Sequence, residues 1–198
     1  VDFVSSRLEA SKQMGAERVV NPVQSKLEDE VREWTNGHGV DAVLLCVGGK
    51  GREASDSAIA CLRDRGVMVI VGIYDAELSW KTAYMKDIQV RYSRSYGPGR
   101  YDPQYEWGGQ DYPIGHVRWT ENRNMQSFLD LVAQSKVNVA AMTTHHFPLD
   151  RAAEAYSLIT GKTPNADGKP YFGIVLDYPR STSARLQRSV QNSTAILI

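Results

Sequence analysis

The sequence has few cysteines and no long apolar run. Cys46 and Cys61 are its two cysteines among 198 residues; they fall in an expected buried strand and an expected helix, which indicates reduced core thiols rather than a disulfide or a metal site. The longest apolar stretches, 42–47 and 67–73, are far shorter than the roughly 20 residues that span a bilayer. With no signal peptide expected either, we predict a cytoplasmic protein with no membrane partner.

An excess of charge of either sign is also absent. Lysine plus arginine equals aspartate plus glutamate, at 23 each. Balanced charge gives no general attraction to nucleic acid or to an anionic membrane. The apolar content of 42% and charged content of 23% are ordinary for a globular protein. These values favour an enzyme that acts on a small molecule.

A further absence concerns glycine-rich turns, because no G-x-G-x-x-G occurs anywhere in the chain. Yet Val1-Asp2-Phe3 is typical of a strand that ends in a carboxylate, and a helical pattern follows at 6–14. In a dinucleotide-binding Rossmann fold, such an acid binds the adenosine ribose, and the glycine-rich turn binds the pyrophosphate. Because the acid is present, the turn is absent and residue 1 is not Met, we expect the amino-terminal part of a longer protein to be missing, and we expect these 198 residues alone to be insoluble or molten.

The pattern of the first half alternates between strands and helices. Ser5 or Ser6 is expected to cap the first helix and Gly15 to end it. The strand at 41–47 is continuously apolar, as in a parallel sheet covered by helices on both faces. Strands are expected at 18–21, 41–47, 67–71 and 88–94, and further helices at 27–34 and 52–62. The order predicts an α/β fold, a Rossmann-like doubly wound parallel sheet that lacks its first strand and glycine-rich turn.

The second half begins with residues 95–120, which are rich in aromatic residues, glycine and proline and have no clear period. A stretch of this length is usually functional or packed by its own side chains. An amphipathic helix is expected at 121–134, with Met125, Phe128, Leu129 and Val132 on one stripe. We expect an extended segment at 137–147, a helix after Pro148 and a strand at 171–178; the helix should bury Leu149, Ala152, Ala153, Tyr156 and Ile159.

These patterns divide the chain into three expected parts. Residues 1–94 form a partial dinucleotide-binding domain, and 95–179 form the aromatic, Gly/Pro-rich loop and a return to a catalytic domain. Residues 180–198 contain three arginines and no acid, which is typical of a linker.

Several motifs occur in the order found in one known family. They are Val1-Asp2-Phe3 with Arg7, Met14-Gly15-Ala16, Val20-Asn21-Pro22, Gly39-Val40-Asp41 and the segment 66–72, followed by 144–149, Ala155-Tyr156 and 173–176. Over residues 1–178 the chain resembles the carboxyl-terminal portion of zinc-type, medium-chain alcohol dehydrogenases. Segments 95–103, 112–115 and 118–121 are similar to a subgroup in which such a dehydrogenase is fused to a Gfo/Idh/MocA-type oxidoreductase domain.

The resemblance and the fold imply a set of cofactor-binding residues. Asp2 would accept hydrogen bonds from both ribose hydroxyls, which favours NAD, and its charge would repel the 2′-phosphate of NADP. Arg7 would lie beside the ribose. The strand ends would supply backbone contacts and an apolar shelf for the nicotinamide. The predicted cofactor-binding residues are Asp2, Arg7, Val47, Gly48, Val71, Gly72, Ile73 and Ser95.

Polar residues after the last strand of the sheet are the candidates for substrate binding. Arg94, Tyr96 and Arg100, with Tyr101 and Asp102 nearby, suit a hydroxylated or anionic substrate; an ordered loop or an oligomer contact is the structural alternative. His145 and His146 are adjacent on an extended segment and should point to opposite faces, so we expect no shared metal ion.

The resemblance implies reversible hydride transfer between an alcohol and nicotinamide, in a small-molecule enzyme that forms a homo-oligomer when full length. Zinc would enter only through the missing amino-terminal domain, because none of the family's zinc-ligand motifs lies in this sequence, and no catalytic residue is assigned. Two alternatives stay open, a methyltransferase that binds S-adenosylmethionine through Asp2 and a non-catalytic remnant or interaction domain.

Overall fold

A computed structural model of the protein describes residues 1–162 and 171–179. The expected linker at 180–198 lies outside the described residues. The chain divides into two compact units, Val1–Val139 and a second unit that begins at Ala140. Among the described residues, no helix combines the length and apolar character needed to cross a membrane.

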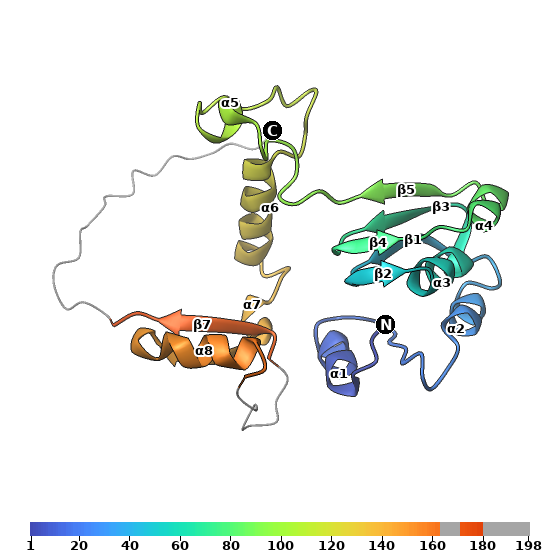
Figure 1. Cartoon of the computed structure of the whole chain (residues 1–198), viewed down its shortest axis with the longest axis horizontal. Coiled ribbons are helices and arrows are strands. Elements are labelled where there is room, and N and C mark those ends of the chain that lie inside the picture. Colours follow the sequence, from blue (N-terminus) through green and yellow to red (C-terminus); the bar gives the residue numbers. More distant parts are fainter. Residues whose placement is uncertain (163–170, 180–198) are drawn as a thin grey trace. The chain divides into compact units, whose positions relative to one another are not determined.

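The first unit contains a three-stranded parallel sheet (Figure 1). Its order is β1 (Val40–Leu45), β3 (Leu62–Ile70) and β5 (Gln89–Tyr92). Leu45 pairs with Ile70, and Ile70 pairs with Tyr92. The three strands therefore end together, and this end is called the carboxyl edge of the sheet. The α/β fold with a parallel sheet is confirmed.

Helix α3 (Glu53–Cys61) covers one face of this sheet through contacts with β1 and β3. The core between them contains Leu45, Ala58, Leu62, Met68 and Ile70. Helix α2 (Leu27–Trp34) packs on α3 in turn. The hydroxyl of Ser57 donates to Glu28 Oε1 across this contact at 2.7 Å, and this hydrogen bond lowers the pKa of Glu28.

Burial of β1 on both faces was expected, and for the described residues this expectation is wrong. Leu45 faces the core, but Leu44 is 66% exposed and Cys46 is exposed as well. Successive side chains of a strand point to opposite faces, and α3 covers only the face that carries Leu45. The apolar run therefore predicted the strand correctly but not the number of covered faces. Cys61 is buried, as expected.

The amino-terminal segment differs from its prediction in two details. Helix α1 (Ser5–Gln13) is preceded by Val4, whose N–H donates to Asp2 Oδ1 at 2.8 Å, and the structure gives the helix no side-chain cap. The predicted serine cap is therefore wrong. Residues 1–3, expected to end a strand, and residues 18–21 form no strand; one hydrogen bond, from Asp2 N to Val20 O at 3.2 Å, joins the two segments, and one bond does not make a ladder.

Short elements complete the sheet region. β2 (Gly49–Gly51) pairs in parallel with β4 (Tyr74–Ala76). Helix α4 (Trp80–Met85) precedes β5, and Lys86 is the residue directly after α4. The ammonium group of Lys86 donates to the carbonyl oxygens of Ile59, Ala60 and Leu62 at the end of α3. This contact stabilises the last turn of α3, where backbone carbonyls lack helical partners.

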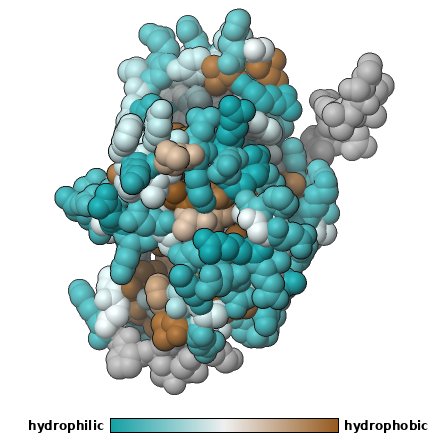
Figure 2. Space-filling view, turned by 90° about the vertical axis from the view of Figure 1, so that its right-hand side faces the viewer, coloured by the Kyte–Doolittle hydropathy of each residue, from teal (hydrophilic) through white to brown (hydrophobic). Residues whose placement is uncertain are grey.

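The rest of the first unit contains two helices. α5 (Pro103–Glu106) lies inside the stretch expected to be irregular, and its N-cap Asp102 accepts from Gln104 N. α6 (Glu121–Ala133) confirms the helix expected at 121–134. Its stripe of Met125, Phe128 and Leu129 is exposed. Figure 2 shows hydrophobic residues in separate patches among hydrophilic ones on the face drawn.

The second unit contains a parallel pair of strands covered by a helix (Figure 1). The chain forms α7 (Val139–Met142) and then β6 (Thr143–Pro148), a 3₁₀ turn at Leu149–Arg151, α8 (Ala152–Ile159) and β7 (Gly173–Asp177). The extended segment predicted at 137–147 is therefore wrong at α7. The predicted buried face of α8 is also wrong: Ala155 and Leu158 are buried, whereas Tyr156 and Ile159 are exposed. Helix α8 contacts β6, and Tyr156 and Ile159 each lie one residue, or about 100° around the helix axis, beyond the buried Ala155 and Leu158.

Candidate functional site

Two loops meet at the carboxyl edge of the sheet. The loop after β1 contains Val47 and Gly48, and the loop after β3 contains Val71, Gly72 and Ile73. The N–H groups of Val71 and Gly72 donate to Leu45 O at 3.0 and 3.2 Å, and Gly49 N donates to Ile73 O at 3.0 Å. The structure thus brings the predicted residues of both strand ends together through main-chain hydrogen bonds.

Glycine is required at one of these positions. A Cβ atom on Gly72 would lie 2.0 Å from Val47 O, an impossible contact with the main chain. A Cβ on Gly48 would lie 3.8 Å from Ile73 O, which is ordinary van der Waals contact. The close approach of the two loops therefore depends on Gly72 and not on Gly48.

Apolar side chains at this edge are open to solvent. Val47 and Val71 are exposed, and Ile73 is 95% exposed. An exposed apolar shelf at the carboxyl ends of parallel strands is the usual place for a ligand in an open α/β sheet. The roles of these residues as nicotinamide contacts stay predictions.

Asp2 and Arg7 lie together near the amino terminus. Arg7 Nη1 is 3.7 Å from Asp2 Oδ2, and the Asp2 side chain is 32% exposed. Since Oδ1 of Asp2 already accepts from Val4 N, the carboxylate is held in place with oxygen lone pairs still accessible. Among the described residues, no hydrogen bond or ion pair joins Asp2 or Arg7 to the loops that contain Val47 and Gly72.

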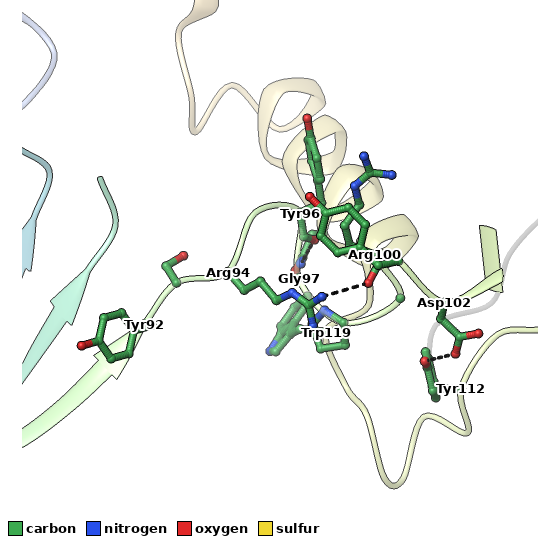
Figure 3. Close-up of a pocket in the computed structure, with 13 residues that line it drawn as sticks. Tyr92, Arg94, Tyr96, Gly97, Arg100, Asp102, Tyr112 and Trp119 are labelled. Atoms are coloured by element: carbon green, nitrogen blue, oxygen red, sulfur yellow. Dashed lines mark hydrogen bonds between the residues drawn. The ribbon is translucent and has the colours of Figure 1, made fainter. Parts of the chain in front are cut away.

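A cavity of about 1000 Å³ follows β5 (Figure 3). Most of its lining comes from residues 94–124, here called the aromatic loop. The predicted substrate-binding residues Arg94, Tyr96 and Arg100 line the cavity, and Ser95 does not; their role in binding stays a prediction. The lining residues are Tyr92, Ser93, Arg94, Tyr96, Gly97, Pro98, Gly99, Arg100, Tyr101, Asp102, Tyr112, Trp119 and Asn124.

Arg100 is fixed by several partners within the aromatic loop. Its guanidinium lies 4.5 Å from the ring centre of Tyr101 and 5.5 Å from that of Tyr96. Nη1 of Arg100 also donates to Glu106 Oε1, and this bond lowers the pKa of Glu106. The positive charge of Arg100 is therefore compensated inside the loop.

A hydrogen bond between Tyr112 and Asp102 joins two segments of the aromatic loop. The Tyr112 hydroxyl donates to Asp102 Oδ2, while Gln104 N donates to Oδ1 at 2.9 Å. The Tyr112 bond lowers the pKa of Asp102 and raises the pKa of Tyr112, because it stabilises the ionised carboxylate and the protonated phenol. Figure 3 shows this pair joined at the edge of the cavity.

The backbone of the aromatic loop is strained at two tyrosines. Tyr96 and Tyr101 have φ angles of +61° and +68°, in the left-handed region that bulky residues rarely adopt. Asn124 holds the first of these turns, since its Nδ2 donates to Tyr96 O at 2.9 Å. Strained residues persist only where the surroundings fix them, and they are often found at functional sites.

Sequence reasoning missed part of this site. It did not identify Asn124, Glu106 or the Asp102–Tyr112 bond. The density of aromatic residues at 95–120 was the available signal, but the partners of each side chain depend on how the loop folds.

The two histidines of the second unit have separate partners. His145 Nδ1 lies 2.9 Å from Thr144 Oγ1, and His146 Nδ1 lies 3.2 Å from Asp177 Oδ1. Within residues 1–162 and 171–179, no group of three or more His, Cys, Asp and Glu side chains could hold a metal ion.

Comparison with known proteins shows the family to which the chain belongs. The sequence profile of the family described as "Zinc-binding dehydrogenase" matches residues 1–107, more than half of the chain, so the chain belongs to this family. Alcohol dehydrogenase 1 of Pisum sativum is 36% identical over 107 residues, which are 52% of this chain and 27% of that protein. Sorbitol dehydrogenase of Halalkalibacterium halodurans is 25% identical over 156 residues, which are 77% of this chain and 38% of that protein.

Solved structures agree on the fold. Alcohol dehydrogenase TADH from Thermus sp. ATN1 matches with a TM-score of 0.66 and 21% identity, over 90% of this chain and 42% of that chain. This likeness shows an α/β fold similar to the cofactor-binding domain of alcohol dehydrogenases. The chain spans about a quarter to two fifths of the length of the relatives named here.

Proposed function

We propose that the protein is an NAD-dependent oxidoreductase that transfers a hydride between an alcohol or polyol carbon and nicotinamide. The observation that carries the proposal is the shared carboxyl edge of β1, β3 and β5, in a chain of the zinc-binding dehydrogenase family. Its relatives carry the names alcohol dehydrogenase and sorbitol dehydrogenase. The nicotinamide supplies the hydride acceptor when bound, and this chain orients it.

The residues of the carboxyl edge suit that cofactor. Val47, Val71 and Ile73 present an exposed apolar surface for one face of the nicotinamide ring; Gly48 is exposed beside it, and Gly72 allows the close approach of the two loops. Ser95 follows the third strand and is proposed as a further contact. An apolar wall of this kind would also exclude water from the reacting carbon.

Asp2 and Arg7 are proposed to bind the adenosine ribose. The carboxylate of Asp2 would accept hydrogen bonds from the ribose hydroxyls and would repel a 2′-phosphate, which favours NAD over NADP. Arg7, 3.7 Å away, would hold this carboxylate in place.

Substrate activation is proposed to need residues outside this chain, so the 198 residues alone should be inactive. Any zinc would be bound by those residues, since the described residues offer no cluster of three metal-ligating side chains. The same proposal includes a cytoplasmic location, a homo-oligomer and a fused Gfo/Idh/MocA-type domain. The full-length sequence would test the fusion, and the mass of the full-length protein in solution would test the oligomer.

NADH binding to the full-length protein, followed by fluorescence, tests the proposal. Asp2→Asn should raise the Kd for NADH about 10- to 100-fold, the range expected for hydrogen bonds to a charged group. Asp41→Asn is the matched control, because Asp41 lies at the start of β1, is exposed and pairs with Arg63; it should leave the Kd unchanged.

NADPH is titrated in the same way, and S-adenosylmethionine, which lacks a fluorescent nicotinamide, is titrated by calorimetry. Weaker binding of NADPH than of NADH supports the assignment of Asp2. Binding of S-adenosylmethionine without NADH, or an NADH affinity that Asp2→Asn does not change, would contradict the proposed role.

A further inference from the structure

The two arginines that line the cavity of the aromatic loop have very different partners. Arg100 is paired with Glu106 and lies against two tyrosine rings. Arg94 is exposed; its Nη2 donates to Arg100 O at 3.4 Å and its guanidinium lies 5.2 Å from the ring centre of Tyr101. Among the described residues, no carboxylate lies within ion-pair distance of Arg94. Arg94 therefore carries a positive charge that the fold leaves uncompensated.

The position of Arg94 connects the carboxyl edge with the cavity. Ser93 N donates to Ile70 O at 2.9 Å, which continues the pairing of β5 with β3 beyond Tyr92. Arg94 is the next residue, and Figure 3 shows its side chain reaching across the loop toward Arg100. A ligand group bound by Arg94 would thus lie beside the strand ends where the nicotinamide is proposed to bind.

The charges around the cavity favour an anion at this place. Its charged lining residues are Arg94, Arg100 and Asp102. Arg100 is compensated by Glu106, and Asp102 is already bound by the Tyr112 hydroxyl and Gln104 N. Arg94 differs from these two groups because no carboxylate of the described residues pairs with its guanidinium, whose donors are arranged in a plane that matches a carboxylate or a phosphate.

The remaining lining suits a hydroxylated carbon chain. The phenol of Tyr96 and the amide of Asn124 offer hydrogen-bonding groups, and the rings of Tyr101 and Trp119 offer flat apolar surfaces. Contacts with Tyr101 and Arg100 O also restrict Arg94 before a ligand binds, which reduces the entropy lost on binding.

From these contacts we propose that Arg94 is a specificity-determining residue that binds an oxyanion on the substrate, so that the preferred substrate is a polyol or sugar with a carboxylate or a phosphate group. This inference rests on the proposed dehydrogenase function. Arg100 has a positioning role in it, since it holds the loop that orients Arg94.

The test compares neutral and anionic polyols as substrates of the full-length enzyme with NAD. Sorbitol, gluconate and sorbitol 6-phosphate have similar carbon chains and differ in charge. The wild type should show the highest kcat/KM with one of the two anions, and which anion it is identifies the group. Arg94→Gln should lower kcat/KM for that anion about 10- to 100-fold and leave that for sorbitol within about twofold.

Arg118→Gln is the matched control. Arg118 is also exposed and lies over an aromatic ring, 5.1 Å from the ring centre of Trp119, but it does not line this cavity. Its substitution should change neither substrate preference nor rate. If wild type does not prefer an anion, or if Arg94→Gln affects sorbitol and the anion equally, the inference is wrong.

A binding measurement separates this inference from the proposed function. The preferred anion is titrated calorimetrically into the enzyme–NADH complex, in which alcohol oxidation cannot occur, with wild type and Arg94→Gln. Loss of anion binding in the variant, with NADH binding intact, supports the role of Arg94. Intact NADH binding with equal anion affinities overturns the role of Arg94 alone, whereas failure to bind NADH at all overturns the proposed function first.

Discussion

The carboxyl edge of the sheet and the aromatic loop are neighbours in the chain but are held together by different forces. Main-chain hydrogen bonds position the edge, and the buried side chains of Leu45, Met68 and Ile70 support it. The aromatic loop buries only Gly99 and Thr120 among residues 94–124. Its shape depends instead on cation–π contacts, an ion pair and hydrogen bonds between side chains.

This difference fits the proposed division of roles, in which the carboxyl edge binds the cofactor and the aromatic loop determines substrate specificity. An edge built from the backbone tolerates many side chains and suits a cofactor that is common to a family. A loop built from side-chain contacts changes with every substitution, which is where substrate specificity usually resides. The two regions should therefore respond differently to substitution.

Gly72→Ala should disrupt the carboxyl edge most severely. Its Cβ would collide with the main-chain oxygen of Val47, and a fixed main chain cannot yield as a flexible side chain does. We expect a loss of about 3 kcal/mol in the free energy of unfolding, measured by denaturant titration of the full-length protein. Gly48→Ala, where the Cβ would make only an ordinary van der Waals contact, should cost less than about 0.5 kcal/mol; equal losses would mean that the edge is not set by close backbone approach.

Tyr112→Phe should loosen the aromatic loop and leave the sheet unchanged. The lost hydroxyl no longer stabilises the Asp102 carboxylate, so the pKa of Asp102 should rise toward its usual value. Because the folded protein lowers this pKa, the bond stabilises the loop at pH values above about 4 and is lost as the pH falls through the lowered pKa.

NMR titration of the Asp102 carboxyl and hydrogen exchange of the loop amides check this prediction. Exchange in 94–124 should become faster near neutral pH, while exchange in β1, β3 and β5 stays the same. Faster exchange in the strands as well would show that the two regions do not open independently.

The two cysteines should give the smallest perturbation. Burial raises the pKa of the Cys61 thiol from its usual value of 9.0 to about 11, and Cys61 is only 4% exposed. Cys46, in contrast, is exposed. Iodoacetamide at pH 8 should therefore label Cys46 in the folded protein and Cys61 only after unfolding. Mass spectrometry of wild type and Cys46→Ala checks this result, and rapid labelling of Cys61 in the folded variant would contradict it.

The raised pKa of Cys61 also has a stability consequence of known sign. Below about pH 9 the thiol is protonated in both states. As the pH rises from about 9 to about 11 the unfolded chain loses this proton while the folded protein retains it, so the Cys61 contribution to stability falls with rising pH.

Much of the sheet was predictable from local patterns. The positions of β1, α3 and β5 follow from apolar runs and from the spacing of Ser55, Ala58 and Ile59, and the left-handed Gly15 after α1 follows from glycine chemistry. Predictions of burial were wrong where burial depends on which other elements pack against a residue, because a sequence pattern does not show those elements. Leu44 belongs to an apolar run yet is exposed, and α8 buries Ala155 and Leu158 while the apolar side chains of Tyr156 and Ile159 are exposed.

The sequence by itself determined the alternation of strands and helices, the balanced charge and the acid at position 2, because these depend on spacing and residue type. Only the tertiary structure decided that Gly72 must lack a side chain, that Glu106 compensates Arg100 and that Arg94 has no carboxylate partner among the described residues. Each of these facts depends on the distance between residues that the chain must first bring together, and residue spacing along the sequence does not fix such distances.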